Sequence, residues 1–409
     1  MSSKKTITLF TGNYAPEDTA IGLYTSQFAV FLSNKGYDVS VITGFPYYPK
    51  WQIADEYQNK NTYFNEIIDG ITVLRYKQFI PKNVSFVGRI KLMLSLLWGN
   101  YINSKKIKQT DLVICIVPFT LSVLTAYLLA RKTKAKLWVH VQDFEFDLAF
   151  QSGVLHSSFL GKVIKKSVFS FEKYLLKKAN VLSTISFNMI EKSKQKTDFN
   201  TIYYFPNWIS SKNINPNIAK QHPFINKDKF TLLYAGNIGE KQDWKLCENV
   251  CEKLNAEGVE IVIVGNGAYV EKLKAKFLKF NCIRFYEPIP YSDLNDLLCS
   301  ADLHFLFQKT DVLDTVMPSK ILGMMASGKP SIITGNKDSE VSRIFTTNQI
   351  DGYFHTDEID PILNYIKKQQ NNKIALLNYD EKAKNYVLDN FSEENILKNF
   401  EAKIKEVLD

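Results

Sequence analysis

The sequence has no long apolar run and few of the residues that build metal and redox sites. Over 409 residues, none of its hydrophobic runs is long enough to span a bilayer, and the opening MSSKKTITLF predicts a strand rather than a signal peptide. The five cysteines form no Cys-x-x-Cys pair, and the five histidines show no spacing typical of a zinc site. These absences predict a reduced, cytoplasmic protein without a bound metal.

Acidic residues are in the minority. The 42 aspartates and glutamates face 51 lysines and arginines, which gives a formal net charge of +9. This balance suits three kinds of partner: nucleic acid, an anionic membrane surface, or phosphorylated small molecules. A content of 45% hydrophobic and 13% aromatic residues excludes a disordered chain and suffices for two domain cores.

Apolar strands alternate with amphipathic helices in two series. We expect strands at 6–12, 37–43, 112–118, 136–143 and 180–186, and again at 230–236, 260–267, 283–290, 302–308 and 330–334. Near-continuous apolar strands separated by helices are typical of a parallel, doubly wound sheet. The polar stretch 210–228 interrupts the rhythm and predicts a linker, and the last segment has the apolar spacing of a helix.

Glycine turns follow strands in both series, where α/β proteins bind their ligands. The first turn leads into a helix at Gly22, and a later one, AGNIGEKQDW, contains Gly236, Asn237 and Lys241. A third, VGNGAY, contains Gly265. A glycine turn beside a lysine suits a diphosphate, although a tight loop without ligand and a solvated helix face would look similar.

The stretch DTVMPSKILGMMASGKP predicts a short helix that starts at Pro318 and stops near Gly328. A helix amino end carries a partial positive charge, so Lys320 is unfavourable there unless an anion binds. Pro318, Ser319 and Lys320 therefore indicate a phosphate site.

Five stretches together resemble a known family: GNYAPEDTAIGLYT, HVQDFEFD, AGNIGEKQ, VIVGNGA and DVLDTVMPSKILGMMASGKP. In this order they are similar to the retaining glycosyltransferases of family 4, and most to the bacterial colanic acid biosynthesis type. The resemblance implies the GT-B fold, an α/β architecture of two facing Rossmann-like, doubly wound parallel-sheet domains with a C-terminal crossover helix. It implies an acceptor-binding domain at 1–208, a linker at 209–228 and a nucleotide-sugar-binding domain at 229–391, with helix 392–409 packing back on the first domain.

The resemblance also implies which residues hold the donor diphosphate. The loop at Gly22 would face the diphosphate and the acceptor. Gly236, Asn237 and Lys241 match the family's phosphate element, with Asn237 where arginine is usual. Lys241 would neutralise the leaving diphosphate, together with Ser319 and Lys320.

Two further segments would contact the rest of the donor. The turn 284–290 resembles the one that cradles the nucleobase, with Arg284 and Tyr286 as candidates. Members carry two glutamates before the phosphate helix; Gly323 stands at the second, and Asp311 or Asp314 would replace the first, which contacts the donor sugar.

The catalytic polar group is ambiguous. Many members have His-Asp after a strand of the first domain, where this chain has Gln142-Asp143. His140 lies two residues earlier on the same strand face. The group is therefore Gln142, His140 or Asp143.

The implied reaction is retaining sugar transfer in bacterial capsule, O-antigen or exopolysaccharide assembly. The donor would be a GDP- or UDP-linked sugar, giving a hexosyl, N-acetylhexosaminyl or fucosyl transferase, and the acceptor a polyprenyl-diphosphate-linked saccharide. No Asp-x-Asp motif is present to bridge a metal, so we expect no metal and no cofactor besides the nucleotide-sugar cosubstrate.

Residues 79–108 mix aromatic, apolar and basic residues without an acidic one. They predict either an amphipathic core helix or peripheral contact with the inner membrane and a lipid-linked acceptor. Two other functions compete: a GT-B-like sugar-nucleotide 2-epimerase, which needs carboxylate and histidine pairs, and a non-enzymatic basic scaffold that binds membrane or nucleic acid. The glycine turns favour the transferase, and we expect no nucleic-acid partner.

Overall fold

The structure is a computed structural model that divides the chain into two compact units. The first contains residues 1–206 and 397–409, and the second contains residues 207–396. The described residues are 4–18, 20–48, 50–81, 86–147, 159–210, 213–254, 258–310, 319–355, 359–374 and 380–409. Within these ranges, no helix has the length and apolarity that crossing a membrane requires.

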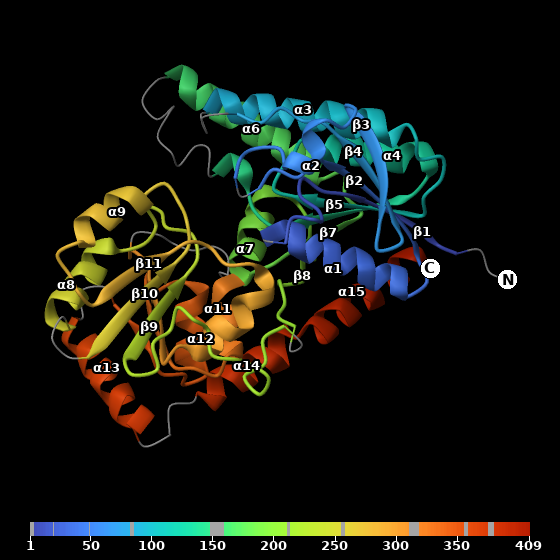
Figure 1. Cartoon of the computed structure of the whole chain (residues 1–409). Coiled ribbons are helices and arrows are strands. Elements are labelled where there is room, and N and C mark those ends of the chain that lie inside the picture. The colour runs from blue at the N-terminus through green and yellow to red at the C-terminus, as the bar shows by residue number, and fades with distance from the viewer. Residues whose placement is uncertain are drawn as a thin grey trace. The chain divides into compact units, whose positions relative to one another are not determined.

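The first unit is built on one sheet of eight strands (Figure 1). The strands are β1 (Thr6–Phe10), β2 (Asp38–Gly44), β3 (Tyr63–Ile68), β4 (Ile71–Tyr76), β5 (Leu112–Val117), β6 (Lys136–Val141), β7 (Val181–Thr184) and β8 (Tyr203–Tyr204). Their order in the sheet is β3-β4-β2-β1-β5-β6-β7-β8. The helices are α1 (Ala20–Asn34), α2 (Asp55–Gln58), α3 (Phe86–Ser104), α4 (Ser122–Thr133), α6 (Phe159–Leu176) and α7 (Phe187–Lys196).

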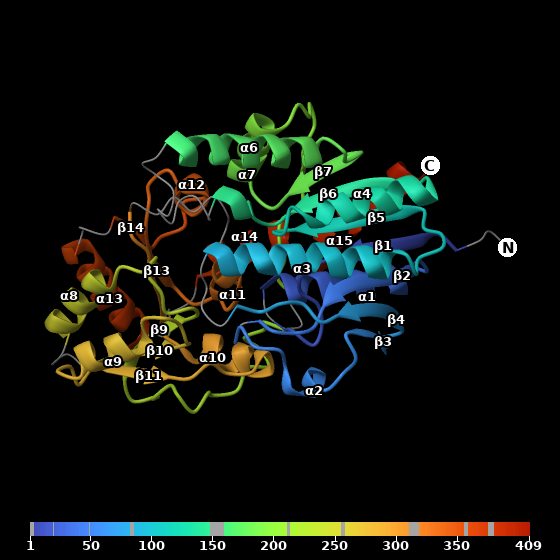
Figure 2. The same ribbon diagram turned by 90° about the horizontal axis from the view of Figure 1, so that it is seen from above.

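Helices cover both faces of this sheet. In Figures 1 and 2, α3, α4 and α6 lie side by side on one face, and α1 lies on the other. The end of the last helix, α15 (Glu393–Leu408), joins the face of α1: Phe400 lies 4.8 Å from the ring of Phe28 and 4.2 Å from that of Phe205. Burial of these rings ties the C-terminal residues to the first unit.

One strand of the first sheet departs from the predicted parallel pattern. β3 and β4 form an antiparallel hairpin, in which Ile68 pairs with Ile71. The two loop residues, Asp69 and Gly70, have φ angles of 51° and 77°. Positive φ at both loop positions is the backbone of the tightest hairpin turn, and Asp-Gly is a sequence that adopts it readily.

The second unit has a sheet of six strands, and every described pair in it is parallel. The strands are β9 (Phe230–Ala235), β10 (Val259–Val264), β11 (Ile283–Tyr286), β12 (Leu303–Phe307), β13 (Ser331–Thr334) and β14 (Tyr353–Phe354), in the order β11-β10-β9-β12-β13-β14. The helices are α8 (Trp244–Leu254), α9 (Val270–Phe277), a 3-10 turn at Tyr291–Asp293, α10 (Leu294–Ser300), α11 (Ser319–Ala326), α12 (Glu340–Thr347), α13 (Ile359–Ile374) and α14 (Glu381–Phe391). The two sheets confirm the predicted α/β class with parallel strands.

The segment that precedes β9 packs on the second unit. The backbone N–H of Ile209 donates to the carbonyl of Phe391 at 2.8 Å, and that of His222 donates to Ser300 Oγ at 2.8 Å. Ile209, Ile214 and Ile225 are buried in the core of this unit. Although the stretch 210–228 is polar in composition, its buried isoleucines attach it to the core of the second unit.

Candidate functional site

Two glycine turns touch at the carboxyl ends of β9 and β10. The N–H of Gly236 donates to the carbonyl of Val264 at 2.9 Å, and the N–H of Gly265 donates to Tyr286 O at 3.0 Å. A Cβ atom on Gly265 would lie 1.9 Å from the carbonyl oxygen of Gly236, at a φ of 156°. Only glycine fits this approach, so the parallel register of the two strands fixes the two turns against each other.

Lys320, in the first turn of α11, lies against the Gly236 turn. Its Nζ donates to the hydroxyl of Tyr234 at 3.2 Å and lies 4.8 Å from the centre of that ring. A Cβ atom on Gly236 would lie 2.9 Å from this Nζ. The Tyr234 hydroxyl in turn donates to the carbonyl of Asn237 at 2.5 Å. Tyr234 was not predicted, because a tyrosine inside an apolar strand is ordinarily a core residue.

Two more lysines flank the same turn. Gln242 and Gln308 form an antiparallel bridge, in which the N–H of Lys309 donates to the carbonyl of Lys241 at 3.0 Å. The side-chain carbonyl of Gln242 accepts from the N–H of Gly239 at 2.9 Å and so anchors the turn. Lys241 is exposed, and none of the described residues forms a hydrogen bond or ion pair with its ammonium. Lys309 was not predicted, because the bridge that places it cannot be seen in the sequence.

The structure does not bring Arg284 to these turns. Its side chain lies 3.9 Å from Glu260, near the amino end of β10, whereas the glycine turns follow the carboxyl ends. The ring of Tyr286 is stacked on Phe224, with centroids 4.0 Å apart and planes at 9°. One face of Tyr286 is therefore already covered by the protein.

Four predicted positions are described only in part or not at all. Asp311, Asp314 and Pro318 lie outside the described residues, and Ser319 is described only as the first residue of α11. Their roles stay predictions.

The loop after β1 in the first unit is organised around a buried glutamate. The Glu17 carboxylate accepts the N–H groups of Tyr47 and Tyr48, both at 2.7 Å, and the amide of Asn13 at 3.0 Å. Burial raises the pKa of Glu17, and these hydrogen bonds partly offset the increase. A Cβ atom on Gly22 would lie 2.7 Å from the carbonyl of Glu17. The glycine therefore allows the loop's own close approach to α1, and its contact with the donor stays a prediction.

His140 lies near the end of β6, and Gln142 directly follows this strand. Both belong to one buried network of hydrogen bonds. The amide nitrogen of Gln142 lies 3.0 Å from His140 Nε2, and Ser183 Oγ lies 2.9 Å from Nδ1 and accepts from the indole of Trp138 at 2.7 Å. Burial lowers the pKa of His140 to about 3, so the imidazole is neutral at pH 7. With both ring nitrogens occupied, His140 is placed to hold Gln142. Asp143 is half-buried, and its carboxylate accepts the N–H of Phe144 at 2.8 Å.

Glu145 follows directly and was not predicted. It is buried, and its Oε2 has no hydrogen-bond partner among the residues that the structure describes. Burial raises its pKa to about 8; the charge of Arg89 opposes this increase, while Asp143 and Glu172 add to it. A buried carboxyl group that stays protonated at neutral pH is unusual and occurs often at functional sites. No sequence pattern indicates such a group, since desolvation depends on the folded surroundings.

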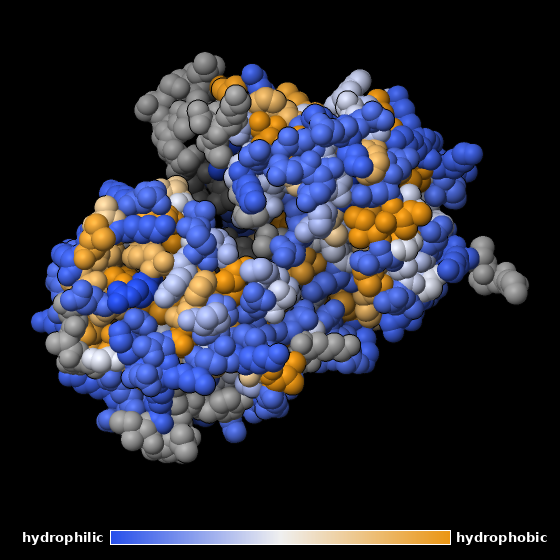
Figure 3. All heavy atoms as spheres, viewed as in Figure 1, coloured by the Kyte–Doolittle hydropathy of each residue, from blue (hydrophilic) through white to orange (hydrophobic). Residues whose placement is uncertain are grey.

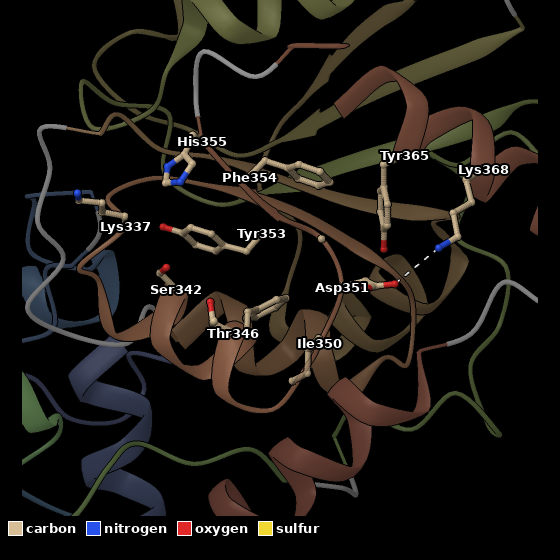
Figure 4. A pocket seen from close by; sticks show the side chains of 12 residues that line it. Lys337, Ser342, Thr346, Ile350, Asp351, Tyr353, Phe354, His355, Tyr365 and Lys368 are labelled. Carbon is tan, nitrogen blue, oxygen red and sulfur yellow. Dashed lines mark ion pairs between the residues drawn. The ribbon is translucent and has the colours of Figure 1, made fainter. Parts of the chain in front are cut away.

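The second unit has a hollow of about 650 Å³ beside the edge strand β14. In Figure 4, Tyr353 and Phe354 of β14, Ser342 and Thr346 of α12, and Tyr365 and Lys368 of α13 surround it. Among the predicted donor residues that the structure describes, none lines this hollow. It is therefore distinct from the glycine turns.

Comparison with known proteins points to one class of enzyme. Residues 216–386 match the profile of the family described as Glycosyl transferases group 1, and this range lies within the second unit. The chain is 28% identical over 401 residues to WcaI of Escherichia coli (strain K12), named as a colanic acid biosynthesis glycosyl transferase, covering 95% of this chain and 97% of WcaI. The second unit thus matches group 1 glycosyltransferases in sequence.

Solved structures match both units. Sucrose-phosphate synthase from Thermosynechococcus elongatus superimposes with a TM-score of 0.72 at 11% identity, covering 99% of both chains. Anabaena HepE, in complex with UDP and glucose, gives a TM-score of 0.63 at 13% identity, covering 98% of this chain and all of HepE. These are GT-B glycosyltransferases, so the predicted GT-B fold is confirmed.

Proposed function

We propose that the chain is a retaining, metal-independent glycosyltransferase of family 4. It transfers a sugar from a UDP- or GDP-linked donor to a lipid-linked saccharide in bacterial surface polysaccharide synthesis. The observation that carries the proposal is the position of Lys320 against the Gly236–Gly265 turns, flanked by Lys241 and Lys309. One ammonium against the backbone turns, with two further lysines in the adjoining chain, would suit a compact anion of high charge, such as a diphosphate.

The chemistry follows from this charge. In sugar transfer, the bond between the anomeric carbon and the donor phosphate breaks as the acceptor oxygen bonds to that carbon. The leaving diphosphate gains negative charge, and lysines already in place stabilise it most as that charge develops. The acceptor proton passes to the leaving phosphate oxygen on the same face of the sugar, which gives retention without a separate base.

The identity of the donor and the pathway rests on relatives. WcaI is named for colanic acid biosynthesis, which supports a surface polysaccharide as the product. The HepE structure contains UDP and glucose, which supports a nucleotide-linked donor. Both features come to this chain by similarity.

Incubation with radiolabelled UDP- and GDP-sugars and an extract of lipid-linked saccharides tests the reaction. Transfer of label to the lipid fraction is the expected result. Conversion of the free sugar nucleotide to its 2-epimer would instead identify an epimerase. Absence of any turnover with every donor and acceptor would favour a non-enzymatic scaffold.

The acceptor's lipid requires contact with the inner membrane, and we assign this contact to the outer side of α3. Val87, Leu94 and Trp98 are 60%, 52% and 62% exposed. Together with the exposed Lys91 they recur at intervals of three and four residues, so they share one helix face. Apolar side chains interspersed with lysine suit the boundary between anionic headgroups and acyl chains.

Helix α6 adds to this surface. It lies on the same face of the sheet as α3 (Figure 2), and its Val163, Phe171 and Tyr174 are exposed among lysines. Figure 3 shows hydrophobic residues between hydrophilic ones along the upper edge, where α3 and α6 lie. A protein held there would stay peripheral and cytoplasmic.

A further inference from the structure

The geometry points to Tyr234 as a positioning residue that holds the Lys320 ammonium in place and thereby selects nucleoside diphosphates over monophosphates. This inference rests on the proposed function, because it assigns Lys320 to the terminal phosphate of the donor diphosphate. It adds a residue for which neither the motifs nor the glycine turns gave any indication.

Tyr234 is held rigidly on its own side. The residue is 1% exposed, and its ring packs on Phe307 at 5.1 Å and on Trp244 at 6.0 Å. Since β9 pairs with β10 and β12, the phenol is fixed at the carboxyl edge of the sheet centre. A side chain with so little freedom can define the position of a flexible lysine.

The direction of the hydrogen bonds makes the phenol an acceptor for Lys320. Its proton goes to the carbonyl of Asn237 at 2.5 Å, so its lone pairs face the ammonium at 3.2 Å. The same ring lies 4.8 Å beneath the charge, and both contacts attract a cation. Burial raises the pKa of Tyr234, which keeps the phenol protonated and this polarity unchanged at physiological pH.

The position of Lys320 suggests what it discriminates. Its Nζ lies against the backbone of Gly236, where a Cβ atom would be only 2.9 Å away. Lysine has four rotatable side-chain bonds, so an unanchored ammonium would sample many positions around the turn. An ammonium that is already held in place loses less conformational entropy when a ligand binds. Only ligands whose phosphate chain extends to Lys320 bind more tightly for this reason.

The experiment measures dissociation constants of UDP, GDP, UMP and GMP by calorimetry. It uses the full-length protein and the variants Tyr234→Phe, Lys320→Met and the double variant. The phenylalanine keeps the ring and loses only the hydroxyl. We expect Tyr234→Phe to weaken the preferred diphosphate on the order of tenfold and the matching monophosphate less than twofold. In the Lys320→Met background the same change should have no further effect on the diphosphate.

Tyr353→Phe is the matched control, because its hydroxyl also donates to a backbone carbonyl, that of Asn336 at 2.7 Å, beside the separate hollow at β14. It should leave all four constants unchanged. If Tyr234→Phe weakens diphosphate and monophosphate equally, or acts undiminished without Lys320, the hydroxyl only supports the Asn237 turn and the inference is wrong. If the wild type binds neither diphosphate, the proposed donor site itself fails, which is a different result.

Discussion

The Nζ atom of Lys320 lies 2.9 Å from the position that a Cβ atom on Gly236 would occupy. Gly265, in the adjoining turn, faces a different neighbour: its Cβ would lie 1.9 Å from a backbone carbonyl oxygen. A lysine end can move aside, whereas a sheet backbone cannot. The two adjoining glycines are therefore needed for different reasons: Gly236 leaves space for a lysine side chain, and Gly265 leaves space for a backbone carbonyl.

The first prediction follows from this difference. Gly236→Ala should displace the ammonium and lower turnover at least tenfold, with a smaller loss of folding stability of about 1–2 kcal/mol from its positive φ. Gly265→Ala should destabilise the second unit by about 3 kcal/mol or more, because backbone must shift. Urea unfolding beside steady-state rates separates the two. Equal stability losses for both variants would contradict the assignment.

The second prediction concerns the cations. Lys241→Ala and Lys320→Ala should each lower kcat on the order of a hundredfold while the midpoint of thermal unfolding stays nearly constant, because both charges act on the developing diphosphate. Lys253→Ala, an exposed lysine in the last turn of α8, serves as the control and should retain wild-type rates. Near-wild-type rates for both active-site variants would show that the phosphate site lies elsewhere.

Much of the fold could be predicted because alternating apolar strands and helices leave a regular trace. The strand predicted at 112–118 is β5, and the strand predicted at 302–308 is β12. The hairpin of β3 and β4 was missed, although Asp69-Gly70 between two apolar runs is a recognisable turn signal. This dipeptide by itself predicts the antiparallel edge.

Site residues could be predicted only where a short local motif, such as a glycine turn, determines their position. Gly236, Gly265 and Lys320 belong to recognisable turns, and the structure brings them together. Lys309 lies beside the same turns because Gln242 pairs with Gln308. Tyr234 meets Lys320, which belongs to a helix far along the chain. Glu145 depends on desolvation. Such properties arise from tertiary packing, which a single sequence does not display.

The third prediction uses the carboxyl group of Glu145. Its pKa is raised from 4.5 to about 8 in the folded protein, so between these pH values the unfolded chain ionises and the folded one does not. The destabilisation that this group causes in the wild type therefore increases as the pH rises from about 4.5 to 8. Glu145→Gln should be similar to wild type at the acid end and more stable by a few kcal/mol at the basic end, at about 1.4 kcal/mol per pKa unit.

Urea titrations of both proteins at the two ends of this range test the sign. Glu56→Gln, which changes an exposed carboxyl group on α2, is the control and should show no such divergence. A stability difference between Glu145→Gln and wild type that is constant with pH would mean that the carboxyl ionises normally.

The fourth prediction concerns the outer face of α3. Sedimentation with vesicles containing anionic lipid should recover the protein at low salt and progressively less as salt rises, since the attraction is screened. Replacing Lys91 of α3 and the exposed Lys105, which follows the last residue of this helix, with glutamine should weaken binding, and Trp98→Ala should weaken it at every salt concentration. Glutamine at Lys272 and Lys276 of α9 removes the same charge from the second unit. If glutamine at these two control positions weakens vesicle binding as much as glutamine at Lys91 and Lys105, binding depends on net charge rather than on α3.

The last prediction joins metal independence to stereochemistry. The chain has no Asp-x-Asp pair, and three lysines flank the turns at which we place the diphosphate. Since these cations can stabilise the leaving group themselves, transfer should proceed at full rate in excess EDTA.

The same arrangement leaves the departing phosphate as the acceptor's base, on the face of the sugar from which it leaves. The new bond should therefore keep the anomeric configuration of the donor, as NMR of the product on a defined synthetic acceptor would show. Activity lost in EDTA and restored by magnesium or manganese would assign the charge to a metal. An inverted product would instead require a base on the opposite face, and Asp143 or Glu145 would then be the side chains to replace first.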